Sequence, residues 1–211
     1  MSTLPAHRLH AIVDVLVCSH AGWPAVDLAR AFFDGGARIV QLRAKDLASG
    51  PFLDLAEGIQ ALAAGYSASV IVNDRIDVAR LSGAHGVHVG QGDLPPATAR
   101  EQLGPDAIVG LSTHTVAQLE AARREPVTYV AVGPVFGTST KDTGYSAVGV
   151  DLVSAASRIA GSLPVVAIGG VNLENAATAI AAGAAAVAVI SDLLTGGDPE
   201  ARVKAYLRAL A

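Results

Sequence analysis

Two carboxylates, Asp74 and Asp93, follow successive apolar segments of the chain, and each stands where a buried strand would end. Neighbouring parallel strands lie about 4.8 Å apart, so side chains at adjacent strand ends could share one cation. Oxygen ligands from only two side chains suit Mg²⁺, which keeps several waters and takes phosphate oxygens as its other ligands. Alternatively, Asp74 caps the following helix and Asp93 belongs to the turn "QGDLPP".

Three cationic side chains, Arg43, Lys45 and Lys141, follow other apolar segments. An arginine forks onto a phosphate through two parallel hydrogen bonds, whereas a lysine acts as a point charge. Together with a metal ion, these cations would suit a diphosphate better than a neutral sugar. They could instead be solvated, or pair with Asp46 and Asp142.

A second anion site is predicted near the C-terminal end of the chain. The segment "AIGGVN" contains Gly169 and Gly170, whose backbone N–H groups can be approached closely because no Cβ is in the way. Ser191 ends the next apolar segment, and the loop "TSTK" at 138–141 adds three hydroxyls and a cation. The alternative is that these glycines only form turns and that the loop is an ordinary polar surface loop.

The histidines give a weaker signal. His88 lies within an apolar segment and is predicted to be a hydrogen-bonded core residue, whereas His114 follows another segment and could face the site. No Cys/His spacing indicates zinc, and no G-x-S-x-G nucleophile motif is present. The other histidines are expected to be structural or solvated: His7, His10, His20 and His85.

The elements that must position these residues alternate along the chain. Eight short β-branched segments are apolar throughout, as is typical of parallel strands covered on both faces. They occupy residues 9–17, 38–43, 69–73, 86–90, 107–112, 128–133, 164–170 and 185–191. Helical spacing is found at 25–33, 52–64, 95–103, 116–124, 152–159, 173–181 and 199–210, with a helix of about two turns expected between the third and fourth strands. N-caps are expected at Thr115, Asn172 and Asp198.

This alternation predicts the α/β class and a single (β/α)8 TIM barrel over residues 1–211. An open doubly wound sheet is the alternative, but such a sheet usually carries G-x-G-x-x-G after its first strand, and "VLVCSHAGWPAV" has no such motif. In a barrel the active site lies at the C-terminal ends of the strands, so the polar groups above would gather on one rim.

The composition agrees with one globular domain. Hydrophobic residues make up 51% of the 211 residues and charged residues 16%, which argues against disorder. The net charge is −4 without a Lys/Arg cluster, so no nucleic-acid partner is expected. The longest apolar run, 176–190, is shorter than the roughly 20 residues of a membrane span, and the first residues resemble no signal peptide. Cys18 is the only cysteine, so a reducing, cytoplasmic location is expected; a homo-oligomer is possible.

Six segments taken together resemble one known family. They are "QLRAK", "VNDRIDVA", "GVHVGQGDLP", "GLSTH", "GPVFGTSTK" and "AIGGVN" with "AGAAAVAVIS", in order over about residues 38–193. They are similar to the thiamine-phosphate synthases, magnesium-dependent (β/α)8 transferases of vitamin B1 synthesis. The resemblance implies that 4-amino-2-methyl-5-hydroxymethylpyrimidine diphosphate is joined to 4-methyl-5-(2-phosphoethyl)thiazole, or to its carboxylated form. Diphosphate would be released, and CO2 also from the carboxylated form.

The resemblance also implies roles for individual residues. Asp74 and Asp93 would hold Mg²⁺. The pyrimidine diphosphate would be bound by Gln41, Leu42, Arg43, Ala44, Lys45, Asn73, Ser112 and Lys141. The thiazole phosphate would be bound by Thr138, Ser139, Thr140, Gly170, Ile190 and Ser191. No protein nucleophile or general base is implied, because departure of diphosphate leaves a cation that the aminopyrimidine ring can delocalise.

The sequence departs from the family pattern in places. The first strand, "LHAIVDVLVCSH", lacks the usual tyrosine-containing ending, Ala44 replaces an acidic residue, and "GTSTKDTGYSAVG" lacks a proline-rich spelling. Thiazole tautomerases, which are isomerases of the same fold, are the alternative, and His114 corresponds to a histidine that they use. They tend to lose the second metal carboxylate, so Asp93, Asn73 and the Thr-x-Thr-Lys loop favour the synthase. A thiazole-phosphate binding or regulatory module is a third, non-enzymatic alternative.

Overall fold

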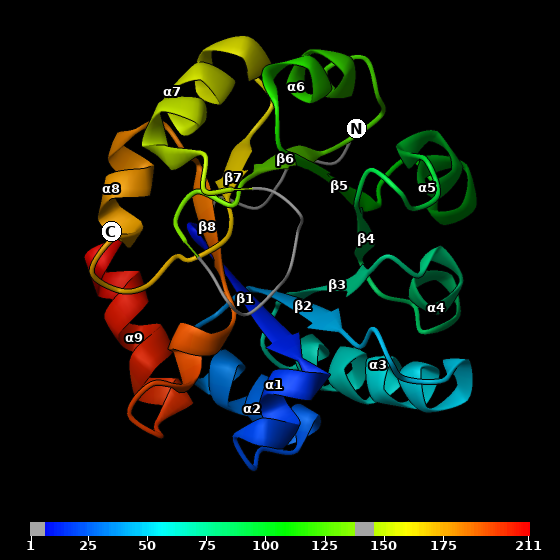
Figure 1. The fold of residues 1–211 in the computed structure, drawn as a ribbon. Coiled ribbons are helices and arrows are strands. Elements are labelled where there is room, and N and C mark those ends of the chain that lie inside the picture. The colour runs from blue at the N-terminus through cyan, green and yellow to red at the C-terminus, as the bar shows by residue number, and fades with distance from the viewer. Residues whose placement is uncertain (1–6, 138–145) are drawn as a thin grey trace.

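Eight parallel strands close into a barrel in the order of the sequence, β1 to β8, as the computed structural model shows for residues 7–137 and 146–211 (Figure 1). The single (β/α)8 TIM barrel predicted from the sequence is thereby confirmed. The strands are β1 Leu9–Asp14, β2 Ile39–Arg43, β3 Ser69–Asn73, β4 Gly86–Val89, β5 Ile108–Thr113, β6 Tyr129–Val132, β7 Val165–Ala167 and β8 Ala186–Val189.

Helices surround the barrel and cover its outer face (Figure 1). They are α1 Val15–His20, α2 Ala25–Asp34, α3 Ser49–Ala64, α4 Ile76–Leu81, α5 Pro96–Leu103, α6 Val116–Ala122, α7 Gly149–Ala160, α8 Ala176–Ala181 and α9 Pro199–Ala209, with a 3-10 turn η1 at Ser191–Leu194. Within the described ranges, none of them is both long and apolar enough to cross a membrane.

Several boundaries differ from the sequence prediction, and two of these differences follow from side-chain hydrogen bonds. The first strand was expected to run to residue 17 but ends at Asp14, whose side chain accepts a hydrogen bond from the Val17 N–H and caps α1. The helix expected from residue 173 begins at Ala176, because Asn172 Oδ1 accepts from the N–H groups of residues 174 and 175 in a preceding turn. Thr115 and Asp198 cap their helices as predicted, through the N–H groups of residues 118 and 201.

The strands are apolar on both faces because they separate two hydrophobic layers. The larger layer lies between the strands and the helices and includes Leu42, Phe32 and Phe33. The smaller layer fills the barrel and includes Ile39 and Ile71. Side chains alternate along a strand, so residues two positions after these isoleucines also face the interior, nearer the C-terminal end. There the interior becomes polar.

Candidate active site

A pocket occupies the interior of the barrel at the C-terminal ends of the strands, where the active site was expected. Every strand or the loop after it contributes to its wall. The predicted site residues in the wall are Gln41, Arg43, Asn73, Ser112, Gly170, Ile190 and Ser191. Leu42 and Ala44 are instead buried in the outer hydrophobic layer, so their side chains face away from the pocket. Thr138, Ser139, Thr140 and Lys141 lie outside the described residues.

Arg43, at the end of β2, forms an ion pair with Asp14 at the end of β1. The two residues are direct partners in the strand register, and the Asp14 side chain is only 3% exposed. Arg43 lines the pocket, and among the described residues its Nε is buried without a hydrogen-bond partner. Asp14 was not predicted as a site residue, because it lies inside the apolar segment 9–17 and not after its end, as Asp74 does after its own segment.

Asp74 and Asp93 lie side by side at the ends of β3 and β4. Burial raises the pKa of the Asp74 carboxyl, the Lys45 ammonium lowers it, and the neighbouring Asp93 carboxylate raises it again. Lys45 Nζ is 2.6 Å from Asp74 Oδ2. The two carboxyl groups therefore lie close enough to interact.

The backbone holds this carboxylate pair in place. Asp74 has a φ of 65°, which is uncommon for a residue with a Cβ, and its N–H donates to the His88 carbonyl at 2.8 Å. Helix α4 begins after Arg75, so Asp74 is not at its cap position. Asp93 Oδ2 accepts from the Gly90 N–H at 2.8 Å, as expected of a residue in this turn.

The residues present suit a magnesium ion. Two adjacent carboxylates repel each other, and a divalent cation between them would relieve this repulsion. Among the described residues, no group of three or more His, Cys, Asp or Glu side chains could hold a metal. An ion held by Asp74 and Asp93 would need further ligands such as water and phosphate oxygens.

A hydrogen-bonded group of side chains lies on the side of the pocket formed by β4, β5 and β6. His88 Nε2 is 2.8 Å from Ser112 Oγ, and His88 Nδ1 is 2.8 Å from the Tyr129 hydroxyl. His88 is thus hydrogen-bonded as predicted, and it also lines the pocket. A Cβ on Gly110 would lie 2.2 Å from Tyr129 Cζ, so glycine is needed for Tyr129 to reach His88.

Two further histidines line the pocket. His10, expected to be structural or solvated, is buried on β1, and burial lowers its pKa to about 3. Among the described residues its Nε2 atom has no hydrogen-bond partner. His114 faces the site, as the sequence allowed, and its Nδ1–H donates to the Gly133 carbonyl.

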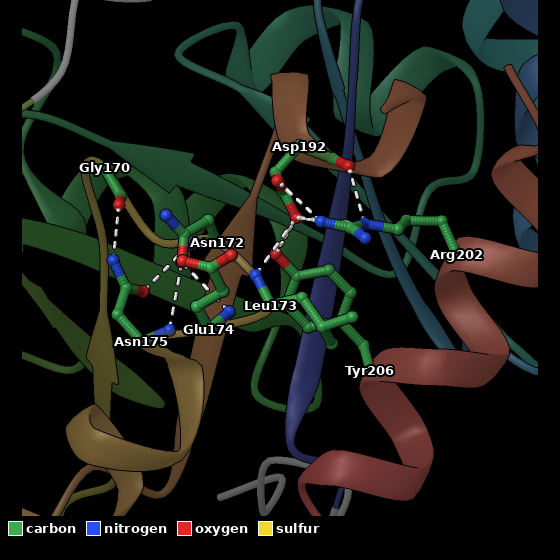
Figure 2. A network of polar contacts seen from close by, with 8 residues as sticks. All are labelled: Gly170, Asn172, Leu173, Glu174, Asn175, Asp192, Arg202 and Tyr206. Atoms are coloured by element: carbon green, nitrogen blue, oxygen red, sulfur yellow. Dashed lines mark hydrogen bonds and ion pairs between the residues drawn. The ribbon is translucent and has the colours of Figure 1, made fainter. Parts of the chain in front are cut away.

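The loops after β7 and β8 form the remaining part of the wall. Gly169 and Gly170 have φ values of 83° and 67°. A Cβ on Gly170 would lie 2.5 Å from the Gly137 carbonyl oxygen, so this glycine permits two loops to pack closely. Ser191 begins η1 next to this loop, and the two loops are joined by the polar contacts in Figure 2.

Comparison with known proteins decides the family. A sequence model described as thiamine monophosphate synthase matches residues 10–193. The chain belongs to the thiamine monophosphate synthase family. The thiamine-phosphate synthase of Roseiflexus sp. (strain RS-1) is 41% identical over 88% of this chain and 78% of its own length. That of Chlorobium phaeovibrioides (strain DSM 265 / 1930) is 42% identical over 89% of each chain.

A solved structure agrees with this membership. The thiamine phosphate pyrophosphorylase from Pyrococcus furiosus superimposes with a TM-score of 0.86 and 27% identity, over 97% of this chain and 96% of its own. Members of the thiamine monophosphate synthase family with these names are transferases, and this chain is an enzyme of that class.

Proposed function

We propose that this transferase joins a hydroxymethylpyrimidine diphosphate to a thiazole phosphate, giving thiamine phosphate and diphosphate. The observation that carries the proposal is the Asp74–Asp93 pair, with Lys45 beside it, just beyond the pocket-lining residues of β2, β3 and β4. This arrangement suits a metal-bound diphosphate. The names of the relatives support the same reaction.

The two substrates are assigned to opposite parts of the pocket. The diphosphate would lie near Lys45 and near Arg43, which lines the pocket. The amide side chains of Gln41 and Asn73 lie in the adjoining wall and would orient the aminopyrimidine ring. The thiazole phosphate would lie against Gly170 and Ser191, the usual phosphate position in barrels.

Catalysis in this proposal depends on charge and positioning. Mg²⁺ held by Asp74 and Asp93 would supply positive charge to the departing diphosphate. Arg43 and Lys45 add positive charge on the same side, which favours cleavage of the carbon–oxygen bond. The pocket then holds the thiazole nitrogen in line with the pyrimidine methylene carbon, so that the new carbon–nitrogen bond forms without a protein nucleophile.

The location follows from the same proposal. Cys18 is buried and unpaired, which agrees with a reducing compartment, and we propose a cytoplasmic enzyme whose partners are two small molecules.

A product assay tests the function. Purified protein with Mg²⁺ and both substrates should form thiamine phosphate and diphosphate in equal amounts, and excess EDTA should stop the reaction. Absence of product with active substrates would refute the proposal.

The same assay separates the synthase from the tautomerase. His114 lines the pocket, and its Nδ1–H donates to the Gly133 carbonyl. This position of His114 is the observation that favours the isomerase as the second candidate function. Isomerisation of the carboxylated thiazole phosphate in EDTA, without condensation, would identify the chain as a tautomerase.

A further inference from the structure

One carboxylate, that of Asp192, joins the two loops assigned to the thiazole phosphate. Asp192 follows Ser191 in η1, and its Oδ2 accepts a hydrogen bond from the Leu173 N–H at 3.1 Å. Leu173 belongs to the loop that contains Gly170. Figure 2 shows this contact linking the segment after β7 to the segment after β8.

The helix α9 holds this carboxylate from the other side. Arg202 Nη2 lies 2.9 Å from Asp192 Oδ1 and 2.8 Å from Oδ2, and Arg202 Nε donates to the Asp192 backbone carbonyl at 3.1 Å. The Tyr206 hydroxyl also donates to Oδ2. Residues 202 and 206 are four apart and so share one face of the helix, as Figure 2 shows.

The Arg202 side chain is 23% exposed and that of Asp192 16%, so water screens this pair only in part. A carboxylate directly after Ser191 would repel a phosphate bound there unless its charge were balanced. Arg202 supplies that positive charge and also donates to the Asp192 backbone carbonyl. The Tyr206 hydroxyl donates to Asp192 Oδ2, the same oxygen that accepts from the Leu173 N–H.

We propose that Asp192, Arg202 and Tyr206 form a positioning network that gives the site its preference for a phosphorylated thiazole over the free thiazole alcohol. The inference rests on the proposed function, because it assigns the thiazole phosphate to the loops of Gly170 and Ser191. None of the three side chains needs to touch the substrate. Each acts through the backbone and the local charge.

The test compares three variants on α9. Arg202→Met keeps the length of the side chain and removes its charge, and Tyr206→Phe removes only a hydroxyl. Lys204→Met is the matched control, since it breaks the exposed Lys204–Glu200 pair on the same helix. Circular dichroism and the thermal midpoint establish that each variant is folded.

Calorimetry then measures binding of the thiazole phosphate, the thiazole alcohol and the pyrimidine diphosphate. In Arg202→Met the Kd for the thiazole phosphate should rise about tenfold or more, and in Tyr206→Phe about threefold, as expected for lost hydrogen bonds to a charged group. The Kd values for the alcohol and the pyrimidine diphosphate should stay within about twofold of the wild type. A twofold change corresponds to about 0.4 kcal/mol of binding free energy. All three Kd values should be unchanged in Lys204→Met.

Equal losses for the phosphate and the alcohol would show a merely structural role and overturn the inference, as would no loss in Arg202→Met. Failure of the proposed function has a different signature, because the wild type would then make no thiamine phosphate. In that case inorganic phosphate is the probe. Weaker phosphate binding in Arg202→Met but not in Lys204→Met would support the network, and equal binding would overturn it.

Discussion

Asp14 and Asp74 show how single residues at the rim form ion pairs with cationic neighbours. Asp14 is almost fully buried and pairs with Arg43, and Asp74 pairs with Lys45. Removing one member of a buried pair leaves the other charge uncompensated, so a change at the buried Asp14 would affect folding as well as binding. Asp93 is exposed, which makes it the better member of the carboxylate pair to change.

We predict that Asp93→Asn lowers kcat by about a hundredfold or more, because one of two carboxylates proposed to hold Mg²⁺ is lost. Steady-state kinetics over a range of Mg²⁺ concentrations measures the effect. Asp54→Asn, at an exposed carboxylate on α3, is the control and should behave as the wild type. Normal turnover with normal metal dependence in Asp93→Asn would remove this residue from the metal site.

His10 should make the protein less stable in acid. Burial lowers its pKa from 6.5 to about 3, so between these pH values the unfolded chain binds a proton on His10 that the folded chain does not. The free energy of unfolding should therefore fall by about 1.4 kcal/mol for each pH unit below 6.5 from this group alone. The contribution of the neutral, buried His10 to the free energy of unfolding is fully present above pH 6.5.

Urea unfolding of the wild type and His10→Gln at pH 7 and pH 5 measures this contribution. The variant cannot take up the proton, so its stability should decline less between the two pH values. Equal declines in both proteins would contradict the assignment of this pH dependence to His10.

At the scale of elements, the alternation of side chains along each strand separates the apolar base of the barrel from its polar end. On β2, Ile39 belongs to the interior hydrophobic layer, and Gln41 two residues later lines the pocket. On β3 the same relation holds between Ile71 and Asn73. The strand thus supplies packing and recognition from one face, and its register decides which residue reaches the pocket.

Gly110 on β5 packs closely against the Tyr129 side chain from β6, and this contact gives a prediction at the scale of elements. In Gly110→Ala the new Cβ would lie 2.2 Å from Tyr129 Cζ and 2.5 Å from His88 Nδ1. We expect the free energy of unfolding to fall by about 1–3 kcal/mol, as for other overpacked cores, and turnover to fall because the contact between these two rings is disturbed.

Chemical denaturation and a kinetic assay measure these two effects. Gly50→Ala, in the exposed first turn of α3 with open space at its Cβ, is the matched control. It should be neutral or slightly stabilising, since alanine favours a helix more than glycine does. If Gly110→Ala has the same free energy of unfolding as Gly50→Ala, the predicted clash between β5 and the Tyr129 side chain is contradicted.

At the scale of the whole molecule, closure of the barrel brings the first and last strands together. β1 pairs with β8, so the pocket is enclosed without a gap between Arg43 on β2 and the loops of Gly170 and Ser191 on its other side. Ligands that bind across this wall hold distant segments together, and binding should therefore stabilise the folded protein as a unit.

We predict that the pyrimidine diphosphate with Mg²⁺ raises the thermal midpoint. At about 100 times its Kd a ligand adds about 2.7 kcal/mol, which corresponds to a shift of about 5–10 °C for a domain of this size. Differential scanning fluorimetry with and without EDTA measures the shift. A shift that persists undiminished in EDTA would contradict a metal-bound diphosphate.

The sequence by itself determined the number and order of the strands and the rim on which polar residues gather. Parallel strands buried on both faces leave unbroken apolar segments, and the residue after each segment must emerge at the C-terminal end. Asp74, Asp93 and Arg43 could be found in this way, because their position depends only on local pattern and on the barrel architecture.

Only the tertiary structure decided which of these groups are neighbours. Arg43 proved to pair with Asp14 and Lys45 with Asp74, and His10 proved to be buried in the pocket wall. The contact of Asp192 with Arg202 and Tyr206 was equally absent from the pattern. Such contacts depend on strand register, on barrel closure and on how a helix packs, and these follow from the sum of many packing interactions rather than from any one segment.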